Sequence, residues 1–331
     1  MGRYFVTGAT GFLGGELTKQ LISRGHRVVA LIRDPARAGI LRTLGVELHQ
    51  GDVTDRDSLV EPMRGVDGMF HCAAWYKVGV PSGEAERINV GGTRNVLDVM
   101  RELGVPRGVY TSSVAVFSDT RGAMPDERYR YDGPHLSEYD RTKWLAHYQV
   151  ALPMMNHGLP LVIVQPGVIY GPGDTSGMHT ALVDLLRKRL PATPRRTAFC
   201  WGHVEDTARG HILAMERGTA GEPYIITGPR HTFEEAFDLI ATLAKVPKPL
   251  LHPGPRTMKA TAAAMSVVQR LVDLPPALTP EALRVIAGVT YLGSNEKAVR
   301  ELGFAARSLR EGMEQTLEYE VRELARRQSD K

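Results

Sequence analysis

Short apolar runs alternate with amphipathic stretches along the first two thirds of the chain. The apolar runs have the length of β-strands, and the stretches between them repeat their apolar positions with helical spacing. Each of the first helical stretches ends just before a glycine, the usual residue past a helix end. This alternation predicts βαβ units and an α/β fold with a parallel sheet. The predicted strands are Tyr4–Val6, Arg27–Ile32, Val46–Gln50, Gly68–His71, Gly108–Thr111 and Leu161–Val164, and the predicted helices are Phe12–Arg24, Pro35–Leu44 and Glu84–Leu103.

The alternation breaks after Gly167, where a loop-rich stretch begins. We therefore expect a doubly wound sheet domain formed by residues 1–170 and 198–230, and a smaller, mostly helical substrate-binding region formed by residues 171–197 and 231–331. The segment Met258–Val272 is rich in Ala, Met and Val, which predicts either the wall of an apolar pocket or a core helix. The other elements predicted here are helices over Leu182–Leu190, His203–Arg217 and Phe233–Lys245, a strand over Tyr224–Thr227, and helical structure over Thr279–Ala325.

The composition is that of a soluble protein with one large core. Of 331 residues 43% are hydrophobic, and the formal net charge is +4. Basic residues are scattered rather than gathered in runs, so nucleic acid is not an expected partner. The two cysteines, Cys72 and Cys200, make neither a disulfide framework nor a metal site. The first strand begins too early for a leader peptide, and no apolar run is long enough to span a bilayer, so we expect a cytoplasmic protein.

A glycine-rich loop follows the first predicted strand and opens the first predicted helix. Gly8, Gly11 and Gly14 have the context of a dinucleotide-binding fingerprint. Glycine lets the backbone turn tightly and approach a pyrophosphate, whose charge the helix N-terminus stabilises. An ordinary glycine turn is the alternative interpretation. The strand–loop–helix context favours a Rossmann-type doubly wound sheet that binds a nicotinamide dinucleotide.

The end of the second predicted strand indicates which dinucleotide binds. Enzymes that use NAD usually carry an acidic residue there, whereas this chain has Arg33, with Arg37 one turn further on. A guanidinium group matches the 2′-phosphate of NADP(H), so NADP(H) is the preferred cofactor and NAD(H) stays open. Both arginines could instead be solvated, or Arg33 could cover the adenine. Asp34 is expected to cap the next helix, and Asp52 with Val53 either meets the adenine edge or caps a turn.

A tyrosine and a lysine one helical turn apart carry the candidate chemistry. Tyr139 and Lys143 share a helix face, since residues i and i+4 are neighbours. At about 4 Å and an effective dielectric of about 20, an ammonium stabilises a phenolate by about 4 kcal/mol. We therefore expect Lys143 to lower the pKa of Tyr139 toward the range of a general acid. An exposed helix face is the alternative for such a pair taken alone.

At this point the residues resemble a known family, the extended short-chain dehydrogenases/reductases. The closest subgroup is similar to dihydroflavonol reductase-like and 3β-hydroxysteroid dehydrogenase-like proteins, and the resemblance reaches about Thr227. The motifs that carry it, in family order, are TGATGFLG at 7–14, GDVTD at 51–55, HCAA at 71–74, NVGGTRNVLD at 89–98, YTSSVAVF at 110–117, YDRTK at 139–143, PGVIYGPGD at 166–174 and HVEDTARGHILAMERG at 203–218.

The resemblance implies a role for each matched position. Ser113, Tyr139 and Lys143 take the catalytic positions: Ser113 hydrogen-bonds the substrate oxygen, Tyr139 passes a proton and Lys143 holds the nicotinamide ribose. It also implies a homodimer formed by the helices near Thr93–Leu103 and Tyr139–Val150. The residues expected to contact the cofactor are Gly8, Thr10, Gly11, Phe12, Leu13, Gly14, Arg33, Arg37, Asp52, Val53, Ala73, Ala74, Lys143, Pro166 and Val168, and those expected to contact the substrate are Trp75, Tyr76, Ser113 and Tyr170.

Three functions compete on these residues. The first is an NADP(H)-dependent reduction of an aldehyde or ketone, or the reverse, on an apolar small molecule. The second is a nucleotide-sugar epimerase or dehydratase that uses the same triad with bound NAD. The third is a non-catalytic NADP(H)-binding sensor. Val114 and Ala115 stand where dehydratases of this family carry acidic residues, and Gln165 stands where epimerases commonly carry arginine. We expect Asn89 to steady backbone near Ser113 or to begin a helix, and His203 to anchor a loop.

Overall fold

Seven parallel strands form the main sheet in the part of the chain that the computed structural model describes, residues 1–76 and 83–329. Their order is β3-β2-β1-β4-β5-β6-β9, so the chain starts inside the sheet and winds outward in both directions. The predicted α/β class with a doubly wound parallel sheet is confirmed. The strands are β1 (Arg3–Thr7), β2 (Arg27–Ile32), β3 (Glu47–Gln50), β4 (Gly68–His71), β5 (Gly108–Thr111), β6 (Leu161–Pro166) and β9 (Pro223–Ile226).

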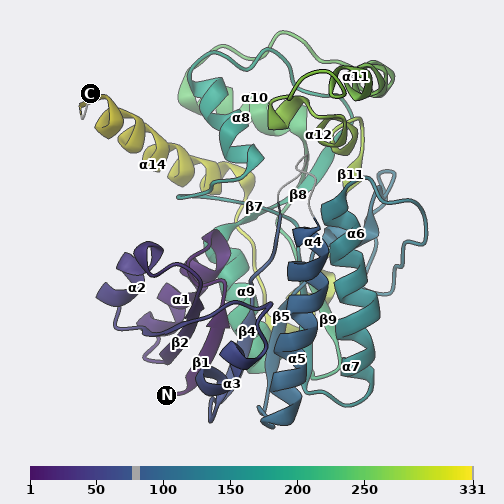
Figure 1. Cartoon of the computed structure of the whole chain (residues 1–331). Coiled ribbons are helices and arrows are strands. Elements are labelled where there is room, and N and C mark those ends of the chain that lie inside the picture. Colours follow the sequence, from purple (N-terminus) through teal and green to yellow (C-terminus); the bar gives the residue numbers. More distant parts are fainter. Residues whose placement is uncertain (77–82, 330–331) are drawn as a thin grey trace.

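Helices cover both faces of this sheet (Figure 1). On one face lie α1 (Phe12–Ser23), α2 (Gly39–Thr43), α9 (Val204–Arg217) and α13 (Glu296–Leu302), and on the other lie α3 (Asp57–Met63), α5 (Thr93–Glu102) and α7 (Leu152–Asn156). Successive strand residues point to opposite faces, so Val6 packs with the first group and Phe5 with the second. The sheet is thus buried on both sides, as its continuous apolar strands predict.

Two helices that flank the candidate site contain π-helical segments. The predicted helix Glu84–Leu103 consists of α4 (Glu84–Glu86), a π segment (Arg87–Gly92) and α5. In the same way, α6 (Glu138–Leu145) runs through a π segment (Ala146–Ala151) into α7. The two π segments contact each other. Such insertions are frequent at functional sites, and apolar periodicity does not reveal them.

A second, smaller sheet lies beyond the carboxyl end of β6. Its central strand is β8 (Ala198–His203), which pairs with β7 (Val168–Tyr170), β10 (Arg230–Thr232) and β11 (Thr290–Tyr291). The prediction of helical structure over Thr279–Ala325 is wrong at β11, because a two-residue strand has no periodicity of its own. The rest of that segment forms α12 (Pro280–Val285), α13 and α14 (Leu309–Ser329).

Helices α8, α10 and α14 pack on the second sheet. Helix α8 (Gly177–Leu186) begins earlier than predicted, because the hydroxyl of Ser176 caps it by accepting from the backbone N–H of Met178 at 3.1 Å. Helix α10 (Phe233–Ala244) has the predicted extent within one residue, and α11 (Pro255–Val268) lies at the outer end (Figure 1). Across the described ranges, every helix is too short or too polar to cross a membrane. The predicted substrate-binding region ends at residues 330–331, which lie outside the described residues.

Candidate active site

The glycine loop lies where the strand order reverses, between the carboxyl ends of β1 and β4. This is the position at which doubly wound sheets bind ligands. Gly8 has a φ of +76°, and a Cβ there would lie 2.8 Å from the backbone nitrogen of Ala73. A Cβ on Gly14 would lie 2.2 Å from the carbonyl oxygen of Gly8. Because both positions exclude a side chain, the backbone at the start of α1 stays open to a pyrophosphate, and the residues fit a dinucleotide.

Arg33 directly follows β2 and Arg37 lies in the short 3-10 helix Pro35–Ala38, and both are exposed. The Arg33 Nε lies 4.0 Å from a carboxylate oxygen of Asp52. The carboxylate of Asp52 also accepts from the backbone N–H and the hydroxyl of Thr54, both at 2.8 Å, so Asp52 caps a turn as one interpretation expected. Asp34 accepts from the backbone N–H of Ala36 at 2.9 Å, which confirms the predicted cap and turns its charge toward the helix.

The other expected cofactor contacts lie on neighbouring strand ends. Ala73 and Ala74 follow β4, and the backbone N–H of Ala73 donates to the hydroxyl of Thr7 at 3.2 Å. Pro166 ends β6, and Val168 begins β7. The side chain of Val53 is buried in the core, and its carbonyl accepts from Nδ2 of Asn95 at 3.0 Å. These assignments remain predictions.

The Ser113 hydroxyl lies against the Tyr139 phenol and favours its charged form. Ser113 follows β5 and caps the short 3-10 helix Val114–Phe117 by accepting from the backbone N–H of Ala115 at 3.0 Å. The backbone thus fixes the Ser113 oxygen, and its proton can be directed to the phenol or to a bound substrate. Tyr139 lies in the first turn of α6, which Ser137 caps. The structure thus brings together the serine and tyrosine that the sequence singled out.

Lys143 lies one turn after Tyr139, and its side chain is buried beneath the carboxyl end of β5. Its Nζ donates to the carbonyl oxygen of Thr111 at 2.7 Å and lies 5.1 Å from the ring centre of Tyr110. Burial lowers the pKa of Lys143 to about 7. Sequence reasoning missed Thr111, because a backbone carbonyl carries no side-chain signal.

The expected lowering of the Tyr139 pKa by Lys143 is not found. Burial of the phenol raises the pKa of Tyr139 to about 12, and the hydrogen bond from Ser113 only partly offsets this. Desolvation disfavours the charged phenolate more than the surrounding groups favour it. In the protein alone, Tyr139 therefore holds its proton, and Lys143 directs its ammonium at Thr111.

Buried histidines hold the strand ends beneath the site in fixed positions. His71 links the hydroxyls of Thr7 at 2.7 Å and Thr93 at 3.1 Å. His147 contacts the hydroxyl of Ser112 at 2.8 Å. Burial lowers the pKa of both His71 and His147 to about 3, so both are neutral hydrogen-bonding groups at neutral pH. Their hydrogen bonds fix the positions of the strand ends, and their rings carry no charge at neutral pH.

Asn89 fastens the loop after β4 to the helix that carries Tyr139. Its amide oxygen accepts from the backbone N–H of Trp75 at 2.7 Å, and its Nδ2 donates to the Trp75 carbonyl and the Thr142 hydroxyl, both at 2.9 Å. We expected Asn89 to steady the backbone near Ser113, but its hydrogen bonds are with Trp75 and Thr142 instead. His203 caps α9 by accepting from the backbone N–H of Glu205 at 3.3 Å, as a structural anchor would.

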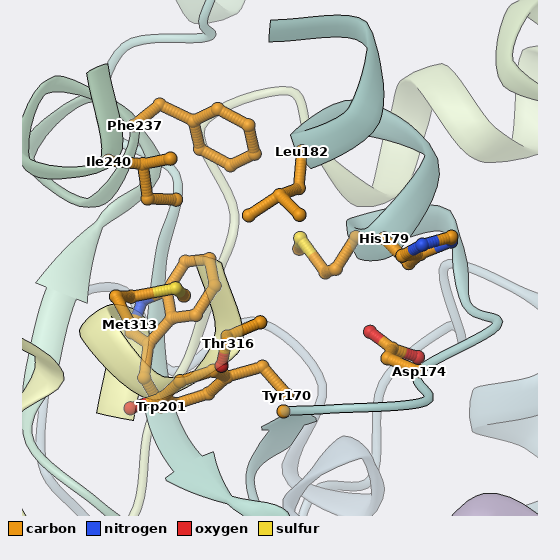
Figure 2. A pocket seen from close by; sticks show the side chains of 11 residues that line it. Tyr170, Asp174, His179, Leu182, Trp201, Phe237, Ile240, Met313 and Thr316 are labelled. Carbon is orange, nitrogen blue, oxygen red and sulfur yellow. The ribbon is translucent and has the colours of Figure 1, made fainter. Parts of the chain in front are cut away.

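Of the four residues expected to contact substrate, Ser113 lies beside Tyr139, and the other three divide into two groups. Trp75 is buried at the end of the β4 loop, and Tyr76 is exposed, with its hydroxyl 3.4 Å from that of Thr175. Tyr170 lines a different, apolar cavity between α8, α10 and α14 (Figure 2). That cavity has room for about one water molecule, at about 20 Å³. This cavity is too small for a substrate and lends no support to Tyr170 as a substrate contact. That assignment stays a prediction.

The N-terminus of α6 is fastened to the second sheet and to α12. The Tyr291 hydroxyl donates to Asp140, and the backbone N–H of Glu138 donates to a carboxylate oxygen of Glu281 at 2.6 Å. Both partners lie far along the sequence, and sequence reasoning missed them. Within the described residues, no group of three His, Cys, Asp or Glu side chains is arranged to hold a metal ion.

Known proteins resemble this chain over almost its whole length. Residues 4–227 match the NAD dependent epimerase/dehydratase family. A putative dihydroflavonol 4-reductase of Synechocystis sp. is 33% identical and covers 94% of this chain and 92% of its own. Sterol demethylase protein B of Methylococcus capsulatus is 32% identical over 92% of this chain and 94% of its own. A 4-hydroxy-2-methyl-3-oxo-4-farnesyl-3,4-dihydroquinoline-1-oxide ketoreductase of Stigmatella aurantiaca is 32% identical over 92% of both.

Solved structures share the fold. The crystal structure of gox2253 has a TM-score of 0.83 at 31% identity and covers 96% of this chain and 98% of that one. The UDP-glucose 4-epimerase of Thermus thermophilus, solved with NAD, has a TM-score of 0.73 at 21% identity over 96% of this chain and 98% of that one. At the lower identity, the likeness concerns the fold alone.

Proposed function

The chain belongs to the NAD dependent epimerase/dehydratase family of extended short-chain dehydrogenases/reductases, and within this family of enzymes we propose that it is an NADP(H)-dependent oxidoreductase. It reduces an aldehyde or ketone to an alcohol, or runs the reverse reaction, with Ser113, Tyr139 and Lys143 as catalytic residues. The observation that carries this proposal is the position of the Ser113 hydroxyl against the Tyr139 phenol, with Lys143 buried one turn further along the same helix.

The two hydroxyls have complementary tasks in a carbonyl reduction. The bound nicotinamide supplies or accepts the hydride. Ser113, held through its oxygen by Ala115, donates its proton in a hydrogen bond to the substrate oxygen, where negative charge develops. Tyr139 gives its proton to the same oxygen, and its raised pKa keeps that proton in place beforehand. Lys143 can turn its Nζ from Thr111 toward a ribose hydroxyl and the phenol.

Two features support NADP(H) rather than NAD(H). Arg33 and Arg37 present exposed guanidinium groups at the end of β2, where a 2′-phosphate would lie. The carboxylates nearby have other partners: Asp34 caps a helix and Asp52 caps a turn. These bonds hold Oδ1 of each carboxylate at the neighbouring turn.

An apolar carbonyl compound or alcohol is the proposed substrate class. The names of three relatives refer to a dihydroflavonol, a sterol and a farnesyl-bearing quinoline oxide, which are all largely apolar compounds. Tyr76 offers exposed aromatic surface on the loop after β4, next to the buried Trp75. Residues 171–197 and 231–331 form the substrate-binding region in this proposal, and residues 1–170 and 198–230 bind the cofactor. The helices near Thr93–Leu103 and Tyr139–Val150 are the proposed homodimer contact.

A nucleotide-sugar epimerase with bound NAD is the alternative function. Its dehydratase variant lacks support, because elimination needs acidic helpers after the serine, and Val114 and Ala115 are apolar and buried. Against the epimerase itself, Gln165 stands where epimerases commonly carry arginine. An epimerase would also retain its nucleotide through purification, because the cofactor is regenerated in each cycle. Retained NAD(H) and interconversion of UDP-sugars without net oxidation would favour this alternative, and a non-catalytic sensor would bind NADP(H) without turning over any substrate.

Replacement of Tyr139 tests the proposal. The purified protein is given NADPH and a series of apolar aldehydes and ketones, and NADPH consumption is measured. Tyr139→Phe should lower turnover by about 100-fold or more while NADPH affinity stays unchanged. Tyr148→Phe is the matched control, since Tyr148 lies further along the same helix, in its π segment, and its hydroxyl donates to the carbonyl of Tyr129. Near-normal turnover in Tyr139→Phe would remove Tyr139 from the mechanism.

A further inference from the structure

Helix α11 directs an apolar face away from the protein. Its inner face packs on α12 through Met258, Ala262 and Met265. At about 100° per residue, Ala263 and Val267 point to the opposite side. Both are exposed, and the side chain of Val267 is 60% exposed. The sequence-based expectation of a pocket wall or core helix is therefore wrong for most of α11, because only Met258 and Ala262 are buried.

Large apolar side chains are also exposed on the segments next to the helix. After its C-terminal end, Leu271 is 82% and Val272 is 55% exposed. Before its N-terminal end, Leu250 is 90% and Leu251 is 62% exposed. Exposed apolar side chains gathered on neighbouring segments are a mark of interaction sites in soluble proteins. We call Leu250, Leu251, Ala263, Val267, Leu271 and Val272 the outer apolar face.

A basic segment adjoins the outer apolar face. Residues 187–196 run beside residues 251–253, where the backbone N–H of Thr193 donates to the Leu251 carbonyl at 3.0 Å and that of Arg195 donates to the Pro253 carbonyl at 3.0 Å. This segment contains five basic residues and no acidic one. Three further basic side chains lie on or just after α11, and Asp273 is the one acidic residue of 250–273. The eight exposed basic residues are Arg187, Lys188, Arg189, Arg195, Arg196, Arg256, Lys259 and Arg270.

The exposed basic side chains indicate which kind of partner would bind the outer apolar face. Within the described residues, none of the eight basic side chains has an ion pair inside the chain. A second copy of this protein would bring like charges together, since a two-fold contact pairs a patch with itself. An apolar helix face bordered by Lys and Arg is the arrangement that binds at the interface of an anionic bilayer. The face lies at the outer end of the molecule, away from the main sheet (Figure 1).

We propose that the outer apolar face, together with residues 187–196, docks on the surface of an anionic membrane. Val267, Leu271 and Leu250 enter the headgroup region, while Arg195 and Arg196 contact lipid phosphates. The protein lies on the membrane and does not span it. This proposal is independent of the reaction that the catalytic residues carry out.

Vesicle flotation of the full chain tests the proposal. One set of vesicles contains phosphatidylcholine alone, and the other contains phosphatidylcholine mixed with phosphatidylglycerol. The protein should float with the mixed vesicles, and binding should weaken as the salt concentration rises. The double variant Val267→Asp/Leu271→Asp should reduce the bound fraction by about tenfold or more, and Arg195→Gln/Arg196→Gln should do so for the mixed vesicles.

A matched control keeps the experiment decisive. Val299→Asp adds the same charge at a side chain that is 49% exposed on α13 and should leave flotation unchanged. Thermal unfolding of each variant verifies that the protein is folded. Equal binding to both vesicle types, or flotation that the paired Asp substitutions leave unchanged, would overturn the proposal. Concentration-dependent dimerisation without lipid, lost in Leu271→Asp, would assign the face to a second copy instead.

Discussion

The hydroxyl of Tyr291 donates a hydrogen bond of 2.9 Å to Oδ2 of Asp140, the residue that follows Tyr139. The contact joins the second sheet to the first turn of α6. Both side chains are buried, and burial raises the pKa of Asp140 to about 7, although Tyr291 and Ser137 hydrogen-bond to it. The first turn of α6, which carries the candidate catalytic tyrosine, is therefore held by a contact with the second sheet.

Removing this contact should destabilise the protein in a pH-dependent way. The folded pKa of Asp140 lies above its unfolded value of 3.8, so its contribution to stability is present in acid and declines as pH rises toward about 7. Tyr291→Phe removes the donor that the charged carboxylate needs. The loss of unfolding free energy, measured by urea denaturation, should be about 1 kcal/mol greater at pH 8 than at pH 5.

Tyr131→Phe is the control for that measurement, because the Tyr131 hydroxyl makes an exposed hydrogen bond to the Pro134 carbonyl. Its effect should be small and equal at both pH values. If Tyr291→Phe lowered the free energy of unfolding by the same amount at pH 5 and at pH 8, Asp140 would not ionise in this range.

Arg33→Gln should weaken NADPH binding and spare NADH. The substitution removes the guanidinium group proposed to hold the 2′-phosphate, which only NADPH carries. The ratio of the two dissociation constants in a fluorescence titration should shift toward NADH by about tenfold, which corresponds to about 1.4 kcal/mol. Arg42→Gln removes an exposed charge from the nearby α2 and should leave the ratio unchanged. An unaltered ratio in Arg33→Gln would refute the 2′-phosphate assignment.

Lys143 should make stability rise with pH. Its folded pKa of about 7 lies below the ordinary value of 10.5, so the unfolded chain binds the extra proton between these values. The free energy of unfolding of the cofactor-free protein should therefore increase from about pH 7 toward pH 10, by at most about 1.4 kcal/mol per pH unit. Lys143→Met should abolish this increase, whereas Lys19→Met, at an exposed site, should retain it. A wild-type profile that is flat over this range would contradict the lowered pKa.

Gly312→Ala should destabilise the packing of α14. A Cβ there would lie 2.1 Å from the hydroxyl oxygen of Tyr170, so one of the two elements must move. We expect a loss of about 1–3 kcal/mol in urea unfolding. Adding Tyr170→Phe should restore part of it, because the hydroxyl is the nearest blocking atom and has no hydrogen-bond partner among the described residues, whereas the ring carbon Cζ, 2.9 Å from the same Cβ, remains. Gly39→Ala, in open space on α2, is the control, and failure of the second substitution to rescue would disprove the steric cause.

Local patterns were sufficient for the main sheet and for part of the site. Predicted strands such as Gly68–His71 have the observed bounds, because a buried strand is a short apolar run with turn residues at its ends. Tyr139 and Lys143 could be paired because helical spacing alone puts residues i and i+4 on one face. The glycine loop was equally clear, since its meaning depends only on the strand and helix next to it.

The tertiary structure alone decided the electrostatics of the site and the contacts between distant segments. The raised pKa of Tyr139 depends on burial, which the sequence near Tyr139 does not encode. Asp140 and Tyr291 are separated by 151 residues, and β11 is too short to have a pattern. The sequence of α11 indicated an apolar helix, and only its packing on α12 revealed that most of this apolar surface faces outward. Periodicity determines which residues share a face, whereas the neighbour that this face meets is determined by contacts between segments far apart in the chain.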